Sequence, residues 1–183
     1  MKDEDLIWKL KDKKAILKTR VFTVTEKTCI SPEGNEGVYI VNDAPEWAIV
    51  IPELEDSFLM VKQWRHGEDG LSIEFPGGVI DKGENPEEGI RRELLEETGT
   101  IAKELIHLGS LNPNPALFSN HVHIYCARNL EFTNTQNLDE DEFLNCIKIP
   151  KAEVFKKMGS KEYPHALMAS ALSLYFQKFY FNN

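Results

Sequence analysis

Residues 76–100 read Pro-Gly-Gly-Val-Ile-Asp-Lys-Gly-Glu-Asn-Pro-Glu-Glu-Gly-Ile-Arg-Arg-Glu-Leu-Leu-Glu-Glu-Thr-Gly-Thr. This stretch predicts a helix over residues 86–98. Asn85 is a favoured N-cap, Pro86 suits the first helical position, and Glu88 stands three residues past the cap, as in a capping box. Gly99 supplies the left-handed conformation that closes many helices. The region is therefore a glycine-rich loop followed by a short, well-capped helix.

Three carboxylates of this helix, Glu93, Glu96 and Glu97, are spaced i, i+3 and i+4, which places them on one side. Like charges at this spacing repel unless a cation lies between them. Oxygen ligands suit Mg²⁺ or Mn²⁺ rather than zinc, and Mg²⁺ readily shares its shell with phosphate oxygens. The pattern indicates metal-assisted hydrolysis at phosphorus. The alternative is a solvated acidic helix face.

The whole stretch resembles the Nudix box, G-x5-E-x7-R-E-U-x-E-E-x-G-U, in which U is a bulky apolar residue. The matching positions are Gly78, Glu84, Arg92, Glu93, Leu94, Glu96, Glu97 and Gly99. Thr100 departs from the pattern at the final apolar slot, which is a packing position. The resemblance implies an α/β fold, an α/β/α sandwich on a mixed sheet with the box as loop-helix-loop.

The resemblance also implies roles for the matching residues. Glu93 and Glu97 would ligate Mg²⁺, or Mn²⁺, with Glu96 supporting them or sharing a second ion. The backbone carbonyl of Gly78 would add a ligand. Arg92 would orient the glutamates through charge-assisted hydrogen bonds.

The flanking sequence is similar to the ADP-ribose and nucleoside-diphosphate-sugar pyrophosphatases. Residues 61–65 and 73–78 follow their Q-Y-R … E-x-P-A/G-G layout, and Pro115 stands about fifteen residues beyond the box. This similarity implies a substrate site that includes Arg65, Glu74 and Pro115. The usual S-P-G is replaced by residues 112–116, so the sugar or terminal group stays open.

Aromatic residues offer further contacts to substrate. Trp47 and Trp64, like Trp8, could stack a nucleobase, and the alternative for each is a core tryptophan. Arg65 could likewise be a surface arginine at a sheet edge rather than a diphosphate ligand.

A general base is expected outside the box, whose glutamates would be occupied by metal. In ADP-ribose pyrophosphatases it comes from a loop ahead of the strand that leads to the C-terminal helices. The carboxylates so placed are Asp139, Glu140, Asp141 and Glu142. Aligning the strand 143–149 with the family's puts Glu140 at the base position, and Glu142 and Glu96 are the alternatives. The acidic run could otherwise be a solvated loop.

The rest of the chain reads as a mixture of strands and helices. β-Branched and aromatic clusters between turn signals predict strands at 20–24, 37–41, 47–51, 57–61, 71–75, 121–126 and 143–149. Two more helices are expected, at 151–158 and 165–180. Residues 1–45 form a β-rich segment, either a small subdomain or a dimerisation arm, and residues 46–183 the Nudix hydrolase domain.

Composition limits the classes of protein. The chain has 183 residues, 42% hydrophobic and 28% charged, with a net charge of −9. This acidic balance argues against a nucleic-acid partner, and neither a secretory signal nor a run of ~18 apolar residues is evident. Three widely spaced cysteines suit reduced thiols. We therefore expect a cytoplasmic protein without a membrane partner, and by resemblance a homodimer.

The sequence thus predicts a Mg²⁺-dependent hydrolase. It would cleave the pyrophosphate of an ADP-ribose-like or nucleoside-diphosphate-sugar substrate into a nucleoside monophosphate and a sugar phosphate. Hydrolysis of a nucleoside triphosphate or dinucleoside polyphosphate is the alternative within the family. A non-catalytic Nudix module that senses nucleotides is a contrasting alternative, which the complete set of box glutamates disfavours.

Overall fold

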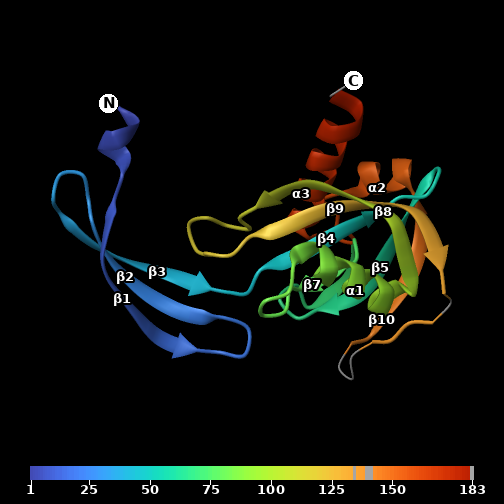
Figure 1. Cartoon of the computed structure of the whole chain (residues 1–183), viewed down its shortest axis with the longest axis horizontal. Coiled ribbons are helices and arrows are strands. Elements are labelled where there is room, and N and C mark those ends of the chain that lie inside the picture. The colour runs from blue at the N-terminus through green and yellow to red at the C-terminus, as the bar shows by residue number, and fades with distance from the viewer. Residues whose placement is uncertain (134, 139–141, 182–183) are drawn as a thin grey trace. The chain divides into compact units, whose positions relative to one another are not determined.

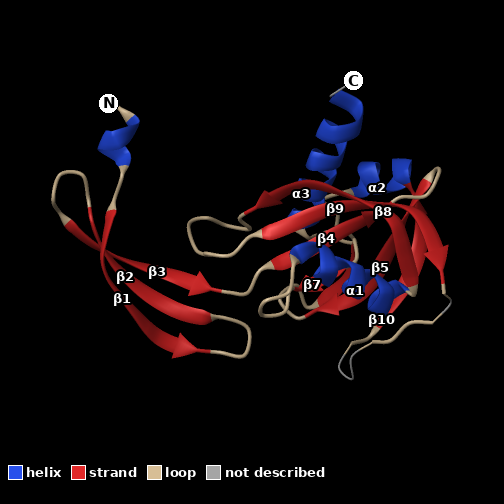
Figure 2. Cartoon of the chain, viewed as in Figure 1, coloured by secondary structure: helices blue, strands red, loops and turns tan. Residues whose placement is uncertain are grey.

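The computed structural model of the chain describes residues 1–133, 135–138 and 142–181. The chain divides into two compact units. Unit 1 comprises residues 1–45 and 112–121, and unit 2 comprises residues 46–111 and 122–183. Figure 1 follows the chain through both units and Figure 2 shows their helices and strands.

Unit 1 is built on a three-stranded antiparallel sheet in the order β1-β2-β3, with bounds Lys9–Lys18, Thr23–Ile30 and Glu36–Asp43. A 3₁₀ turn, Asp3–Leu6, precedes the sheet. The loop 112–121 belongs to this unit through the end of β3: the Asn42 N–H donates to the Leu117 carbonyl at 2.7 Å, and the Ser119 hydroxyl donates to Asp43 at 2.7 Å.

The sheet of unit 1 has almost no core of its own. Within residues 1–45 and 112–121, all of which are described, the buried side chains are the polar Thr25 and Asn120. Every residue of β1 is exposed. Large apolar side chains remain in contact with solvent, among them Trp8, Leu10, Ile16, Leu17, Val38, Tyr39 and Ile40.

Unit 2 contains two sheets. A mixed sheet has the order β7-β4-β9-β8, with bounds Gly77–Val79, Trp47–Pro52, Val122–Phe132 and Thr100–Leu111. Strands β4 and β9 are parallel, and the other pairs in this sheet are antiparallel. An antiparallel sheet has the order β10-β5-β6, with bounds Leu144–Pro150, Ser57–Arg65 and Gly70–Glu74.

Alternation along β4 and β9 separates two hydrophobic cores, because successive side chains point to opposite faces of a sheet. Helix α1 (Pro86–Thr98) packs on one face, where Ile90 and Leu94 meet Ala48 and Val50. On the other face lie α2 (Lys151–Lys157) and α3 (Ala166–Phe176), which continues as a π-helical turn, Gln177–Phe181. Helices on both faces of a mixed sheet confirm the predicted α/β/α sandwich.

The elements agree with the predictions where hydrophobic patterning is strong. Helix α1 has the predicted bounds, and the strands predicted at 47–51 and 71–75 are β4 and β6. Three strands were not predicted: β1, β7 and β8. The strand predicted at 20–24 was misplaced, because residues 19–22 form the turn before β2.

No helix within the described parts of the chain is both long and apolar enough to cross a membrane.

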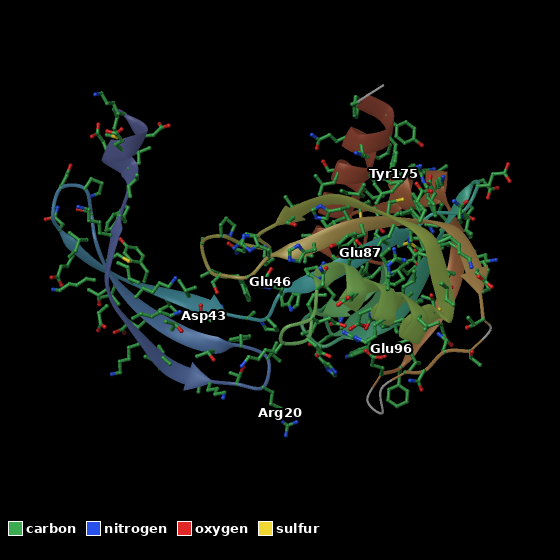
Figure 3. All side chains as sticks on the ribbon, viewed as in Figure 1. Arg20, Asp43, Glu46, Glu87, Glu96 and Tyr175 are labelled. Atoms are coloured by element: carbon green, nitrogen blue, oxygen red, sulfur yellow. The ribbon has the colours of Figure 1, made fainter. Side chains whose placement is uncertain are left out.

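One partly buried carboxylate connects several elements of unit 2. Glu53, directly after β4, accepts hydrogen bonds from Lys151 at 2.7 Å, Arg128 at 2.5 Å and the Tyr175 hydroxyl. These partners lie on α2, β9 and α3, and Figure 3 shows Tyr175 on the last of these helices. Burial opposes the charged form, but the three bonds hold the pKa of Glu53 below its ordinary 4.5.

We expect Glu53→Gln to lower the free energy of unfolding by about 3 kcal/mol near pH 7, because it leaves the partly buried Lys151 and Arg128 without their counter-charge. A lowered pKa means that the stabilisation is present above pH 4.5 and is lost as pH falls through the folded-state value. Denaturant unfolding from pH 7 down to well below pH 4.5 measures this. The difference between wild type and variant should shrink with acidification, and Glu55→Gln, at an exposed site nearby, should change little.

Candidate functional site

Helix α1 begins and ends as its sequence requires. The Asn85 side chain accepts the Glu87 N–H at 2.9 Å, and Gly99 closes the helix with φ 61° in the left-handed region. Figure 3 labels Glu87 in its first turn and Glu96 in its last. Both ends are therefore fixed by local chemistry, which sets the rotation of the glutamate face.

Two glutamates of this face pack against the glycine loop. The Glu97 carboxylate, 3% exposed, accepts the Gly77 N–H at 2.9 Å. The Glu93 carboxylate lies so close to Gly78 that an added Cβ there would stand 2.6 Å from its Cδ. Gly78 is thus the position where backbone and carboxylate meet without an intervening side chain.

The charges of this pair are poorly compensated. Burial, with repulsion from Glu93 and Glu142, raises the pKa of Glu97 to about 8, although the bond from Gly77 and the charge of Arg65 oppose the shift. Burial also raises the pKa of Glu93 despite its contact with Arg92. Two carboxylates, one buried and one partly buried, that both resist ionisation require a cation if both are to be charged.

Arg92 holds the remaining box carboxylates. Its Nη1 donates to Glu93 at 2.8 Å and to Glu96 at 3.0 Å, and its Nε and Nη2 donate to Glu84 at 3.1 Å each. Glu84 also accepts the Asp81 N–H at 3.0 Å. The guanidinium therefore ties the loop to the helix and orients Glu93. Glu96 is turned toward Arg92 and is partly exposed.

The donor set fits a hard divalent cation. Carboxylates from Glu93 and Glu97 and the backbone at Gly78 offer oxygen only. Across the described residues, no three Asp, Glu, His or Cys side chains are already gathered around one point. An ion held here would thus take two protein carboxylates and fill its shell with backbone, water or substrate oxygens, which is the usual manner of Mg²⁺.

A second ion pair stands beside this cluster. Arg65, on β5, donates from Nε and Nη2 to the fully buried Glu74 of β6 at 2.9 and 2.6 Å. Those bonds keep the pKa of Glu74 below its ordinary value despite its burial. The hydrogen bonds to Glu74 raise the pKa of Arg65, and the charge of Glu97 adds to this shift. Two of the residues predicted to contact substrate therefore lie in the electrostatic neighbourhood of the carboxylate pair.

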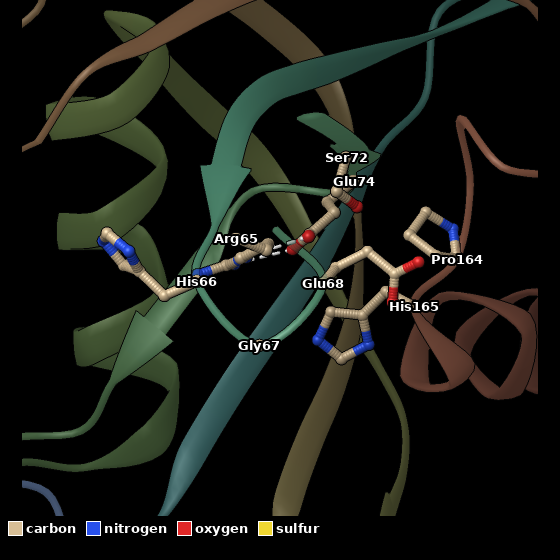
Figure 4. A pocket seen from close by; sticks show the side chains of 8 residues that line it. All are labelled: Arg65, His66, Gly67, Glu68, Ser72, Glu74, Pro164 and His165. Carbon is tan, nitrogen blue, oxygen red and sulfur yellow. Dashed lines mark hydrogen bonds and ion pairs between the residues drawn. The ribbon is translucent and has the colours of Figure 1, made fainter. Parts of the chain in front are cut away.

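This ion pair forms one wall of a pocket of about 290 Å³. Figure 4 shows Glu68, Pro164 and His165 on one side of the pair and His66 on the other. Gly67 and the buried Ser72 complete the lining. Sequence reasoning missed this pocket, because its walls come from a hairpin turn and from the start of α3, which carry no motif.

Glu142 belongs to the same electrostatic neighbourhood. Its charge raises the pKa values of both Glu93 and Glu97. Glu142 lies two residues before Leu144, which pairs with Gln63, and its charge also adds to the raised pKa of Arg65, whose main cause is the hydrogen bonding to Glu74. Glu140, with Asp139 and Asp141, lies outside the described residues, and its assignment as general base stays a prediction.

The other predicted contacts come from different elements of the chain. Trp47 begins β4 and packs partly against the core around α3, whereas Trp64 on β5 is about half exposed. Trp8 lies in unit 1, edge-on to Tyr39 with ring centroids 5.5 Å apart. Pro115 is an exposed residue of the 112–121 loop of unit 1. Their roles toward substrate remain predictions.

Comparison with known proteins identifies similar sequences and a similar structure. The chain is 34% identical over 119 residues to the ADP-ribose pyrophosphatase of Bacillus subtilis, covering 64% of each chain. It is 28% identical over 161 residues to the ADP compounds hydrolase NudE of Escherichia coli, covering 87% of this chain and 86% of that one. A crystal structure of an ADP compounds hydrolase superposes with a TM-score of 0.82 at 26% identity, covering 93% of each chain.

The match to some relatives is partial. The chain spans 64% of the Bacillus subtilis protein and 62% of a methanol dehydrogenase activator from Bacillus methanolicus, to which it is 32% identical. The NUDIX domain matches residues 44–168, which include the glycine loop, α1 and the Arg65–Glu74 pair. The predicted resemblance is confirmed, and the chain belongs to the Nudix family.

Proposed function

We propose that this protein is a Mg²⁺-dependent hydrolase that cleaves the pyrophosphate of ADP-ribose-like or nucleoside-diphosphate-sugar substrates, releasing a nucleoside monophosphate and a sugar phosphate. The observation that carries the proposal is the buried Glu93–Glu97 pair against Gly78, with Arg65 and Glu74 beside it. Similarity to an ADP-ribose pyrophosphatase, an ADP compounds hydrolase and an ADP-sugar pyrophosphatase supports it. The free thiols of the three cysteines suit the cytoplasm.

The roles of the box residues follow from their contacts. Nudix hydrolases generally use divalent metals. Glu93, Glu97 and the Gly78 carbonyl would hold Mg²⁺, or Mn²⁺, and Glu96 would support them through Arg92. When bound, the ion supplies Lewis-acid stabilisation and lowers the pKa of an attacking water. Arg92 fixes the Glu93 carboxylate, and the missing side chain of Gly78 lets that carboxylate approach the backbone.

A carboxylate of the 139–142 segment would accept the proton of the attacking water. We propose Glu140 for this role from its alignment. Glu142, whose charge reaches Glu93 and Glu97, would instead strengthen the negative field that attracts the cation. Separate effects on turnover and on metal affinity distinguish these roles.

A panel of substrates with Mg²⁺, read out by product identity, tests the proposed function. We expect ADP-ribose to give AMP and ribose 5-phosphate, with ADP-glucose or another nucleotide sugar cleaved at the same bond. Triphosphates giving a monophosphate and pyrophosphate as the preferred reaction would contradict this assignment. Binding of nucleotides without any hydrolysis would instead indicate a sensing module.

We expect Glu97→Gln to weaken Mg²⁺ or Mn²⁺ binding and to lower kcat by at least 10²-fold, because it deletes an anionic ligand at constant volume. Titration calorimetry with Mn²⁺ and steady-state kinetics measure the two effects. Glu88→Gln, an exposed change in the first turn of the same helix, is the matched control. Near wild-type turnover in the Glu97 variant would exclude it as a metal ligand.

For the general base, we expect Glu140→Gln to lower kcat by about 10²–10⁴-fold with little change in metal affinity. Glu142→Gln should cost less in kcat and should weaken metal binding, because it removes a charge near the carboxylate pair. The reverse order in kcat would assign the base to Glu142. Small, equal effects would return the role to Glu96.

We propose further that the protein is a homodimer in which residues 1–45 pair two chains. The solvent-exposed apolar side chains of unit 1 support this, since an exposed apolar sheet face usually marks an interaction surface. Val38 and Ile40 alternate with Tyr39 on β3, which places them on one face.

We therefore expect the double variant Val38→Asp, Ile40→Asp to be monomeric by analytical ultracentrifugation, because it buries charge in the proposed interface. Deletion of residues 1–40 should give a monomer or an insoluble chain. Val21→Asp, the same change in the exposed hairpin loop before β2, is the control. A fully active, soluble monomer after the deletion would refute the role of the segment.

A further inference from the structure

The pocket beside Arg65 and Glu74 has a composition that the diphosphate chemistry does not explain. The Nε and Nη2 of Arg65 donate to Glu74, so the charge of Arg65 is already compensated by a buried carboxylate and its attraction for a phosphate is reduced. Glu68 adds a second carboxylate to the lining. A pocket with one compensated arginine and an additional carboxylate repels phosphate and favours a neutral ligand that donates hydrogen bonds.

His165 supplies a complementary donor. Its Nδ1 accepts the Leu167 N–H at 3.2 Å as the N-cap of α3. A backbone N–H can only donate, so Nδ1 carries the lone pair and the proton of the neutral ring lies on Nε2. Burial lowers the pKa of His165, which keeps the ring neutral near pH 7. The pocket therefore combines a carboxylate acceptor with an imidazole donor.

The size and position of the pocket further limit the kind of ligand that it can bind. At about 290 Å³ the pocket is at the small end of ligand sites, which suits one ring rather than a base with its ribose. It shares Arg65 with the electrostatic neighbourhood of Glu97. A group bound here would thus be attached directly to the phosphate next to the carboxylate pair.

We propose that this pocket is the subsite for the terminal sugar of the substrate, and that Glu68 and His165 determine specificity by hydrogen bonding to its hydroxyl groups. The Glu68 carboxylate accepts from a hydroxyl, and His165 Nε2–H donates to a hydroxyl oxygen. The assignment rests on the proposed pyrophosphatase function. It places the sugar half of the substrate in this pocket.

The variants Glu68→Gln and His165→Asn test this assignment. Gln keeps the volume of Glu68 and removes its charge. Asn retains a side-chain oxygen that caps α3 but lacks the distal N–H. His107→Gln, on β8 of the same unit, is the matched histidine control. Binding of ribose 5-phosphate and of AMP is measured by calorimetry with Mg²⁺, and kcat/KM is measured for ADP-ribose and for the β-methyl ester of ADP, which carries no sugar there.

We expect each pocket variant to weaken ribose 5-phosphate binding about tenfold, because it loses one hydrogen bond to a charged or buried group. The binding of AMP should be unchanged. The kcat/KM for ADP-ribose should fall by a similar factor, and that for the methyl ester should not. Weaker AMP binding instead, or no change in either product, would overturn the assignment. If wild type cleaves neither substrate, the pyrophosphatase proposal fails, and ribose 5-phosphate binding alone still decides the role of the pocket.

Discussion

Two carboxylates four residues apart on α1, Glu93 and Glu97, are withdrawn from water against the backbone of a glycine loop. The surrounding structure of unit 2 makes this arrangement possible. The loop must contain glycine where the carboxylate of Glu93 meets the chain, and the helix must be capped so that its glutamate face turns toward the loop. The Ile90 and Leu94 side chains anchor the opposite side of α1 on the mixed sheet. The apolar face of the helix thus contributes to stability, whereas its glutamate face carries negative charge that is not compensated.

Two arginines lie near these carboxylates but do not neutralise their negative charge. Arg92 is saturated by three carboxylates and acts on Glu93 from outside the cluster, whereas Arg65 is paired with the buried Glu74. Neither guanidinium donates a hydrogen bond to Glu97, which accepts the Gly77 N–H. Burial, with repulsion from Glu93 and Glu142, therefore raises the pKa of Glu97 to about 8, and the charge of Arg65 only partly opposes this shift. An arginine inserted between Glu93 and Glu97 would stabilise the fold and would occupy the place of the cation, so the site trades stability for affinity.

The sequence predicted the centre of the site better than its surroundings. The helix bounds, its caps and the orientation of Glu93 and Glu97 follow from local rules of spacing and capping, and the structure agrees with them. The strand β8 was missed, because Leu105, Ile106 and Leu108 do not alternate and only long-range pairing with β9 makes the segment extended. The strand β1 was missed because lysines dominate it and it has no buried face. His165 and Glu68 lie about a hundred residues apart, and no local pattern could join them in one pocket.

The two units differ in how much apolar surface they bury. Unit 2 has two apolar cores and a buried ion network around Glu53, so its carboxylates and its pocket are held by a framework that is complete within one chain. Unit 1 has a regular antiparallel sheet but buries only polar Thr25 and Asn120 within its described residues, and backbone pairing alone seldom stabilises a three-stranded sheet. Packing of its exposed apolar side chains against another surface would therefore be favourable. A second copy of the chain can provide that surface for both partners at once, because a twofold interface buries the same patch on each subunit.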